Sequence, residues 1–285
     1  MNNIIVKTPS NIRELVDCLK CADEDTHLIS GGTDFVIEMR NNPLLNGLIV
    51  DIKGVKELNY IKVEDDLIKI GANATFTEIS ENCTVKKYAR ALSEAASNIG
   101  STQIRNVATL AGNLANCAPA ADSIPALIAL GAEVKIINGE GKIVTVEVEK
   151  TLKVLKKDEA IIEVIVPLRK TYISAFSKVG SRSRVTIAKL NIAVCVNCNE
   201  KIQDVVIAVG SLGPIAHRLE RCEQVLLHEE PSRELLRKFK ESLASEVVLE
   251  IPGRASLPYK REAIVGLCED AFYMLFPKIR GDKVE

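Results

Sequence analysis

The sequence predicts an α+β fold in which strands and helices follow one another irregularly. Helical apolar periodicity marks several segments, and runs of strand-forming residues bounded by turn residues mark others. The regular alternation of strand and helix that a doubly wound parallel sheet requires is absent from this pattern. The chain has 285 residues, of which 47% are hydrophobic, which is enough core for one large or two medium domains.

The first half is expected to mix short helices with strands and hairpins. Ser10 is the expected N-cap of a first helix over 11–22. The acidic turn at 64–66 and the Asn138–Gly141 turn each separate two strand patterns, which predicts two hairpins. Apolar spacing over 85–98 predicts one amphipathic helix. The other expected strands of this half are 48–52 and 161–166.

The second half is expected to hold a separate sheet followed by helices. A polar, proline-marked segment at 167–170 places a domain boundary there, which divides the chain into 1–168 and 169–285. Beyond the boundary, three strand patterns predict an antiparallel sheet, at 173–179, 189–196 and 202–209. Three helical patterns follow, at 218–228, 233–245 and 259–276.

Charge and hydropathy exclude two classes of partner. Lys and Arg number 37 against 38 Asp and Glu, so no basic field is available to bind nucleic acid. No apolar run approaches the roughly 18 residues of a membrane span, and the N-terminus lacks the apolar core of a signal peptide. We therefore expect a cytoplasmic protein that neither spans a membrane nor binds nucleic acid.

Two cysteine pairs have the spacing of a metal or redox motif, but their surroundings argue against both. Cys18 and Cys21 lie in a helical apolar stripe, and Cys195 and Cys198 lie in a strand pattern in which residues three apart face opposite sides. We expect buried, reduced thiols and no metal site. The three histidines lie in no arrangement typical of a catalytic triad, so no catalytic residue is predicted.

The segment 109–131 combines a small, amide-rich first half with an apolar helix. Its first half, 111–121, allows the backbone to approach another object closely, as in a loop that cradles a ligand. Asp122 or Ser123 is expected to cap the helix, and Gly131 to end it. A small-residue turn that packs tightly beneath another element explains the same composition equally well.

A second stretch has the pattern of a phosphate-binding turn. A short strand at 28–29 leads into Gly31 and Gly32, and Thr33 or Asp34 is expected to cap the following helix. No Lys follows the glycines as in a nucleotide triphosphate loop, and the third glycine of the dinucleotide fingerprint is missing. The pattern alone is a weak signal.

Together these motifs resemble the FAD-binding subunits of the molybdenum hydroxylases, a family that includes xanthine, carbon monoxide and nicotinate dehydrogenases. The resemblance rests on Ser30–Asp34, Gln103–Asn113 and Ala118–Asp122, in that order. Later landmarks agree with it: Ser174–Phe176 leading to Lys178, Ile187–Ala188, and Tyr259–Arg261. It implies a two-subdomain FAD-binding domain of the PCMH/VAO type, followed by a smaller C-terminal domain like that of carbon monoxide dehydrogenase flavoproteins.

The resemblance also implies an activity. The chain would bind FAD non-covalently and pass electrons to NAD or another acceptor. The electrons would come from [2Fe-2S] clusters on an iron-sulfur subunit, after substrate hydroxylation on a molybdopterin-binding subunit. A stand-alone FAD-dependent reductase or oxidase is one alternative, and a scaffold subunit with weakened FAD binding is another.

The resemblance implies cofactor contacts for Leu28, Ile29, Ser30, Gly31, Gly32, Thr33, Asp34, Phe35, Ile99, Thr109, Leu110, Ala111, Gly112, Asn113, Asp122, Ile161 and Lys178. Ile99 would lie against the flavin ring, and Ile161 would contact the cofactor through its backbone. Lys178 would lie near the flavin edge. Core packing for Ile99, and a solvated strand position for Lys178, are the alternatives.

Two residues depart from the family pattern. Ala111 stands where glycine is usual, and Ala118 where serine is usual. One methyl group would fit if position 111 requires only a close approach, whereas a positive φ there would cost alanine ~1 kcal/mol. On that basis Ala111→Gly is expected to tighten FAD binding.

Overall fold

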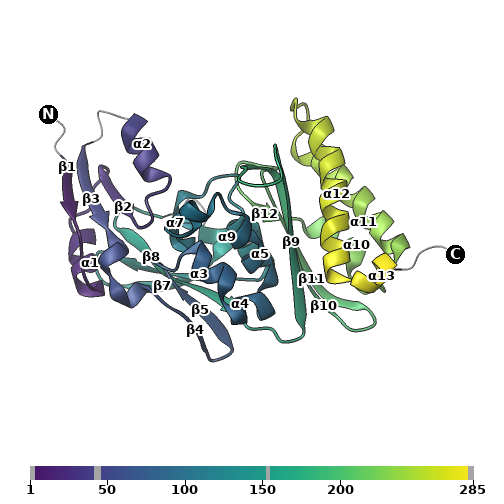
Figure 1. Ribbon diagram of the computed structural model, residues 1–285, viewed down its shortest axis with the longest axis horizontal. Coiled ribbons are helices and arrows are strands. Elements are labelled where there is room, and N and C mark those ends of the chain that lie inside the picture. The colour runs from purple at the N-terminus through teal and green to yellow at the C-terminus, as the bar shows by residue number, and fades with distance from the viewer. Residues whose placement is uncertain (1–3, 42–45, 152–154, 282–285) are drawn as a thin grey trace.

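The computed structural model describes residues 4–41, 46–151 and 155–281, and within these ranges the fold is α+β, as predicted. An N-terminal lobe contains a parallel sheet with the strand order β1-β3-β2 (Figure 1). Its strands are β1 (Ile4–Lys7), β2 (Thr26–Ile29) and β3 (Gly47–Asp51). The lobe also holds α1 (Ile12–Leu19), α2 (Phe35–Asn41) and two 3₁₀ turns, η1 (Ile52–Gly54) and η2 (Lys56–Leu58).

The middle of the chain forms a five-stranded antiparallel sheet with the order β4-β5-β8-β6-β7. Its strands are β4 (Ile61–Glu64), β5 (Leu67–Gly71), β6 (Glu133–Asn138), β7 (Ile143–Glu147) and β8 (Glu159–Pro167). Both predicted hairpins, β4–β5 and β6–β7, are confirmed. The accompanying helices are α3 (Phe76–Glu81), α4 (Cys83–Tyr88), α5 (Arg90–Asn98), α6 (Thr102–Arg105), α7 (Leu110–Asn116), α8 (Ser123–Ala129) and α9 (Val148–Thr151).

The single helix predicted over 85–98 is wrong, because α4 and α5 are separate helices. Ala89 separates them, with a non-helical backbone at φ −132° and ψ 49°. Its side chain is fully buried, so the apolar periodicity continues across the break. Periodicity reports which side chains are buried, and it therefore did not reveal the change in backbone direction.

The predicted cap of the first helix is off by one residue. Asn11, not Ser10, is the N-cap of α1, and its side chain accepts a hydrogen bond from the Glu14 amide at 3.0 Å. Ser10 instead donates its amide to the Glu14 carboxylate at 2.7 Å. Both residue types are good caps, and the neighbouring Asn occupies the position next to the helix.

The predicted C-terminal sheet is confirmed as an antiparallel sheet with the order β12-β11-β10-β9. Its strands are β9 (Tyr172–Gly180), β10 (Ala188–Cys198), β11 (Ile202–Gly210) and β12 (His217–Arg218). The helices that follow are α10 (Glu220–Leu226), α11 (Arg233–Glu250), α12 (Leu257–Leu275) and α13 (Pro277–Gly281). Within the described ranges, no helix has both the length and the apolarity needed to cross a membrane.

This sheet is covered by helices on both faces, which explains its continuous apolar strands. α12 packs on one face, whereas α5 and α8 from the first half pack on the other (Figure 1). Alternate residues serve different cores: Ile192 and Val194 join α11 and α12, whereas Ala193 and Cys195 join the core of the first half. The small side chains on that second face allow α5 and α8 to approach closely.

The C-terminal core allows a test of this packing. Leu243 and Leu249 both lie on α11, but Leu243 is 0% exposed and Leu249 is 59% exposed. We expect Leu243→Ala to lower the free energy of unfolding by about 2–5 kcal/mol, because it leaves a cavity. The matched control Leu249→Ala should change it by less than about 0.5 kcal/mol. Equal losses in urea unfolding would contradict the assigned packing of α11.

Candidate functional site

Gly31 lies where two segments that are far apart in the sequence come into close contact. A Cβ atom at this position would lie 2.1 Å from the Val107 carbonyl oxygen and 2.8 Å from the Ala108 Cα atom. Only glycine fits there, so the turn after β2 can lie directly against the segment that precedes α7. Gly32 has a different function, because its backbone is left-handed with a φ of 68°. The structure thus brings together the two segments that the sequence identified separately.

Side-chain hydrogen bonds hold this turn at both ends. At its start, the Ser30 hydroxyl lies 2.8 Å from the Asn73 Oδ1 atom, and the Asn73 amide donates to the Ile52 carbonyl oxygen at 2.8 Å. At its end, the Asp34 carboxylate accepts a hydrogen bond from the Asn116 amide at 3.0 Å. The glycine turn is therefore fixed to Asn73, which follows β5, and to Asn116 at the end of α7.

The other predicted residues of this stretch continue from strand to helix. Leu28 and Ile29 end β2, Thr33 belongs to the turn, and all three are half-buried. Phe35 begins α2, and its ring centroid lies 5.0 Å from that of His27. His27, which lies on β2, thus packs against the Phe35 ring and lies beside the turn rather than within it.

Residues 110–116 form the helix α7, which corrects the loop expected from their small side chains. Thr109 is the N-cap, and its Oγ1 atom accepts a hydrogen bond from the Gly112 amide at 3.2 Å. Leu110 and Ala111 are buried in the core of the first half, and α7 packs against β8. The alternative interpretation, a small-residue segment packed tightly beneath another element, describes this helix better.

The expectation of backbone strain at Ala111 is also wrong. Ala111 lies in the first turn of α7, its φ is not positive, and its side chain is buried. Ala111→Gly therefore has no strain to relieve, and glycine in a helix costs roughly 0.5–1 kcal/mol relative to alanine. The left-handed residue is Cys117, with a φ of 46°, which ends α7 just before Ala118.

Asp122 occupies the N-cap position of α8, but its carboxylate does not cap the helix. Its Oδ2 atom lies 2.5 Å from the Lys178 Nζ atom, and its Oδ1 atom accepts a hydrogen bond from the Asn191 amide at 2.8 Å. Burial raises the pKa of Asp122, and both partners act in the opposite direction. Ser123 does not supply the cap either, since its hydroxyl lies 2.6 Å from the Asn113 Oδ1 atom.

Lys178 connects three elements from both halves of the chain. Its side chain is only 8% exposed, so the solvated alternative is wrong. Besides Asp122, the ammonium contacts the carbonyl oxygen of Asn98 at the end of α5, at 3.1 Å. Ile99 follows directly, is half-buried, and accepts a hydrogen bond from Arg105 through its carbonyl at 3.1 Å. The structure therefore brings three predicted residues together: Asp122 and Lys178 form a buried ion pair, and Ile99 follows the residue whose carbonyl oxygen Lys178 contacts.

Asn191 is a part of this site that the sequence analysis did not identify. It pairs with Lys178 across β9 and with Gly210 across β11, and its side chain is fully buried. Its Oδ1 atom has no hydrogen-bond partner and would lie 2.3 Å from a Cβ atom at position 210. The available signal was the single polar residue within the apolar run 190–196.

Ile161 is a core residue of β8. It pairs with Ile136 on β6, is 5% exposed, and belongs to the same hydrophobic cluster as Leu110 and Ala111. The strand β8 therefore forms part of the surface against which α7 packs. The structure brings Ile161 near the site only through this packing of α7 on β8.

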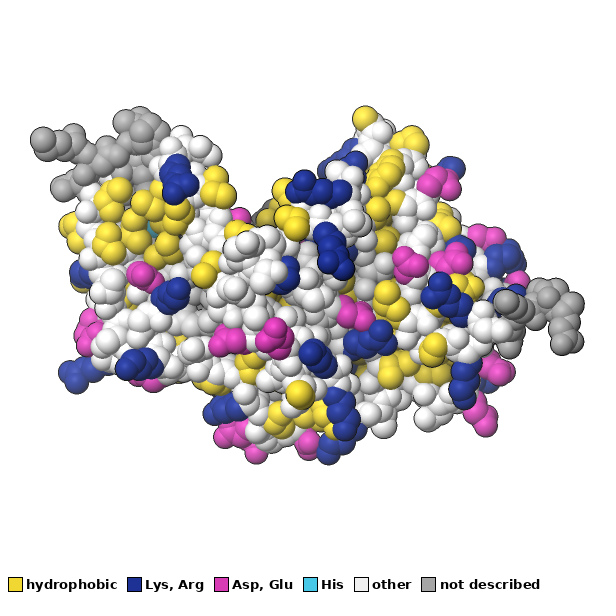
Figure 2. Space-filling model, viewed as in Figure 1, with side chains coloured by type: hydrophobic (Ala, Val, Ile, Leu, Met, Phe, Trp, Pro, Cys, Tyr) yellow, Lys and Arg dark blue, Asp and Glu magenta, His cyan; other side chains and the backbone are white. Residues whose placement is uncertain are grey.

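α7 carries several small exposed residues, and the surface of the molecule is hollowed between its two ends. Figure 2 shows a hollow between the lobe that carries α2 and the part that carries β9 and α12, and in Figure 1 α7 lies between these two parts. Gly112, Ala115 and Asn116 are exposed on α7, and the glycine turn beside them is half-buried. Small residues are thus accessible on α7 beside the glycine turn, an arrangement suited to binding an extended polar ligand.

Among the residues that the structure describes, no group of three or more His, Cys, Asp or Glu side chains could hold a metal ion. Cys18 is buried, but Cys21 lies beyond the end of α1 and is exposed, which corrects that expectation. Cys195 is buried, and desolvation raises its pKa to about 12, so the thiol stays protonated near neutral pH. Cys198 is half-buried.

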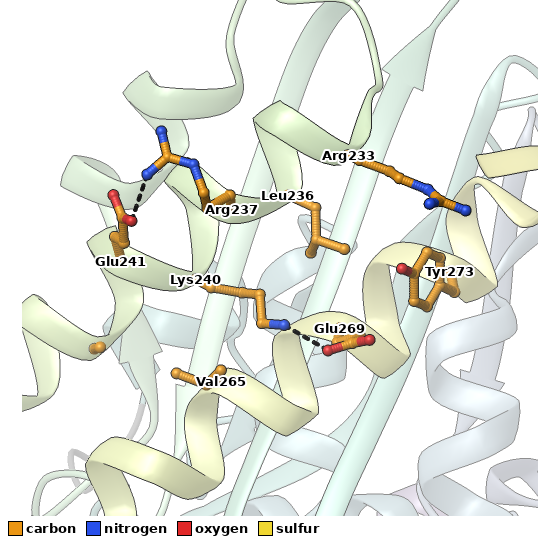
Figure 3. A pocket seen from close by; sticks show the side chains of 9 residues that line it. Arg233, Leu236, Arg237, Lys240, Glu241, Val265, Glu269 and Tyr273 are labelled. Carbon is orange, nitrogen blue, oxygen red and sulfur yellow. Dashed lines mark hydrogen bonds and ion pairs between the residues drawn. The ribbon is translucent and has the colours of Figure 1, made fainter. Parts of the chain in front are cut away.

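A cavity of about 540 Å³ lies between α11 and α12 (Figure 3). Lys240 in its wall lies 2.5 Å from the Glu269 carboxylate, and Arg237 lies 2.6 Å from that of Glu241. These cations already have carboxylate partners. The two helices that line the cavity, α11 and α12, lie on the far side of the C-terminal sheet from α7 (Figure 1), so the cavity is not part of the candidate site.

Comparisons with known proteins agree with this geometry. A family model described as the FAD binding domain in molybdopterin dehydrogenase matches residues 2–169, and one described as the CO dehydrogenase flavoprotein C-terminal domain matches residues 174–275. The nicotinate dehydrogenase FAD-subunit of Eubacterium barkeri is 31% identical over 275 residues, covering 89% of each chain. The xanthine dehydrogenase FAD-binding subunit of Escherichia coli O157:H7 is 31% identical over 245 residues, covering 83% of this chain and 84% of its own.

A solved structure has the same fold. A chain of the carbon monoxide dehydrogenase from Hydrogenophaga pseudoflava superposes with a TM-score of 0.87 at 22% identity, covering 96% of this chain and 98% of that one. The family matches span both halves of the described fold. The chain therefore belongs to the family of FAD-binding flavoprotein subunits of the molybdenum hydroxylases, oxidoreductases that include the xanthine, carbon monoxide and nicotinate dehydrogenases.

Proposed function

We propose that the chain binds FAD non-covalently in the hollow beside α7 and transfers electrons within a cytoplasmic hetero-oligomer. An iron-sulfur subunit would deliver the electrons, and a molybdopterin-binding subunit would hydroxylate the substrate. NAD or another acceptor would receive the electrons from FAD. The observation that carries the proposal is the contact at Gly31, which places the glycine turn directly against the segment leading into α7. Family membership supports the choice of cofactor.

The residues present fit an extended dinucleotide cofactor. The glycine turn offers backbone amides beside the small side chains of α7, which suits a pyrophosphate and its neighbouring chain. The buried pair of Asp122 and Lys178 beside Ile99 offers a charged and an apolar surface for the ring end. When bound, FAD supplies the redox chemistry, and the residues of this chain bind it, orient it and exclude water.

Within this proposal the other predicted contact residues support the site. Leu28, Ile29, Phe35 and Ile161 form the apolar support on which the turn and α7 lie, and Ser30, Asp34 and Asn113 fix it by hydrogen bonds. No described side chain needs to act as a nucleophile.

The visible absorption spectrum tests the proposed function. The purified chain, mixed with FAD and passed through a desalting column, should retain flavin bands, and NADH should bleach them if NAD is the acceptor. Retained bands that bleach only when the iron-sulfur subunit is reduced would support a different acceptor. Loss of all flavin on the column would contradict the proposal.

Gly31 provides a direct mutational test. We expect Gly31→Ala to weaken FAD binding at least tenfold, equivalent to ~1.4 kcal/mol or more, because a Cβ atom there would push the turn away from Val107. Gly266→Ala on α12 is the matched control, since a Cβ atom there has no neighbour within 4 Å. Flavin fluorescence titration measures both. Equal affinities in the two variants would contradict the assigned site.

The buried ion pair allows a stability test. Lys178→Met should lower the free energy of unfolding by about 3–5 kcal/mol, because it leaves the Asp122 carboxylate buried without its cation. Adding Asp122→Asn should recover part of that loss. Lys150→Met, which removes an exposed pair with Glu147, is the control and should cost less than about 1 kcal/mol. Urea unfolding without FAD measures all three, and a double variant no more stable than Lys178→Met would contradict the pairing.

The same variant predicts a pH dependence. Without Lys178, burial is the dominant influence on Asp122 and keeps its folded-state pKa above the unfolded value of about 3.9. Between these two values the folded state holds a proton that the unfolded state has lost. The stability of Lys178→Met should therefore fall as the pH rises through this range, relative to the wild type. A loss of stability that is independent of pH would count against this explanation.

A further inference from the structure

Ser211 adopts a strained backbone at the point where the C-terminal sheet meets the candidate site. It follows β11 with a φ of 61°, a left-handed conformation that costs a non-glycine residue on the order of 1 kcal/mol. Its amide donates to the Pro119 carbonyl oxygen at 2.8 Å, and its hydroxyl donates to the Ala188 carbonyl oxygen at 3.1 Å. The strained residue therefore ties the sheet to the turn formed by residues 117–121.

Lys260 contacts the carbonyl group of Ser211. It lies near the start of α12, and its ammonium donates to the Ser211 carbonyl oxygen. The side chain is half-buried, and desolvation, with a smaller contribution from Arg254, lowers its pKa. Hydrogen bonds thus run from α12 through Lys260 and Ser211 to Pro119.

The 117–121 turn determines how the two halves of the candidate site face each other. It connects α7, which begins after Thr109, to α8, which begins after Asp122. Asp122 is itself held by Lys178 and Asn191. Residues of the C-terminal sheet therefore contact this connection at two separate points. One is the buried contact of Lys178 and Asn191 with Asp122, and the other is the hydrogen bond from the Ser211 amide to the Pro119 carbonyl oxygen.

We propose that Ser211 and Lys260 are positioning residues for the FAD site, although neither belongs to the segments that form it. They hold the 117–121 turn so that the first turn of α7 and the Asp122 pair keep a fixed separation. Holding a site in its binding conformation before the ligand arrives lowers the cost of binding. This inference rests on the proposed function and adds the C-terminal helix α12 to the elements that set FAD affinity.

Lys260→Met tests the proposal, since it keeps most of the side-chain length and removes the donor. We expect FAD to bind about tenfold more weakly, the scale of one lost charge-assisted hydrogen bond. Lys260→Arg, which can still donate to the carbonyl, should restore affinity to within about twofold of the wild type. Lys240→Met, which removes the half-buried Lys240 ammonium and its pair with Glu269 in the α11–α12 groove, is the control and should bind FAD as the wild type does. Flavin fluorescence titration and thermal unfolding without FAD are measured on each protein.

Three results would overturn the proposal. The first is Lys260→Met binding FAD within about twofold of the wild type. The second is a lower melting temperature with unchanged affinity of the folded protein, which would indicate a purely structural role. The third is a loss of affinity that vanishes in about 1 M salt, where exposed charges are screened, because that would mean a direct attraction between Lys260 and the cofactor. A wild-type chain that binds no FAD would instead refute the proposed function.

Discussion

The buried contact of Asp122 with Lys178 and Asn191 is the interaction on which the arrangement of the two halves depends. Removing a carboxylate and an ammonium from water costs several kcal/mol, so each must find its partner in a fixed geometry. One position of α8 against β9 and β10 meets that requirement. Gly210 follows from it, because no side chain fits beside the Asn191 amide. The ion pair therefore fixes the C-terminal sheet against the helices of the first half.

Close backbone approach provides the second constraint. The turn at Gly31 and the segment that leads into α7 meet without an intervening side chain, and small residues on β10 and β11 let α5 and α8 lie close to the sheet. Such contacts leave a surface of backbone groups at the hollow, which suits a ligand recognised by its phosphates and its shape. In this family the cofactor carries the reactive chemistry, and the protein provides a rigid frame for it.

The sequence predicted most of the strands, both hairpins and the glycine turn because these depend on local patterns, but it predicted neither β1 nor β12. It did not predict the break at Ala89, since a buried alanine continues an apolar stripe while its backbone leaves the helix. Small residues at 110–116 suggested a loop, although they form a tightly packed helix. Asn191 was missed because its importance depends on Asp122, a partner that only the folded chain brings near. The assignment of FAD contacts came from the resemblance, since spacing alone left a tightly packed turn as an equal alternative.

Hydrogen–deuterium exchange of the chain with and without FAD tests the central claim most directly, because it reports where the ligand binds. Our account predicts that FAD slows exchange in both the 30–35 turn and the 107–113 segment, and around Asp122 and Lys178. Exchange in α11 and in the groove that it forms with α12 should not change. Protection confined to that groove, or to only one of the two loop segments, would contradict a single site built from both.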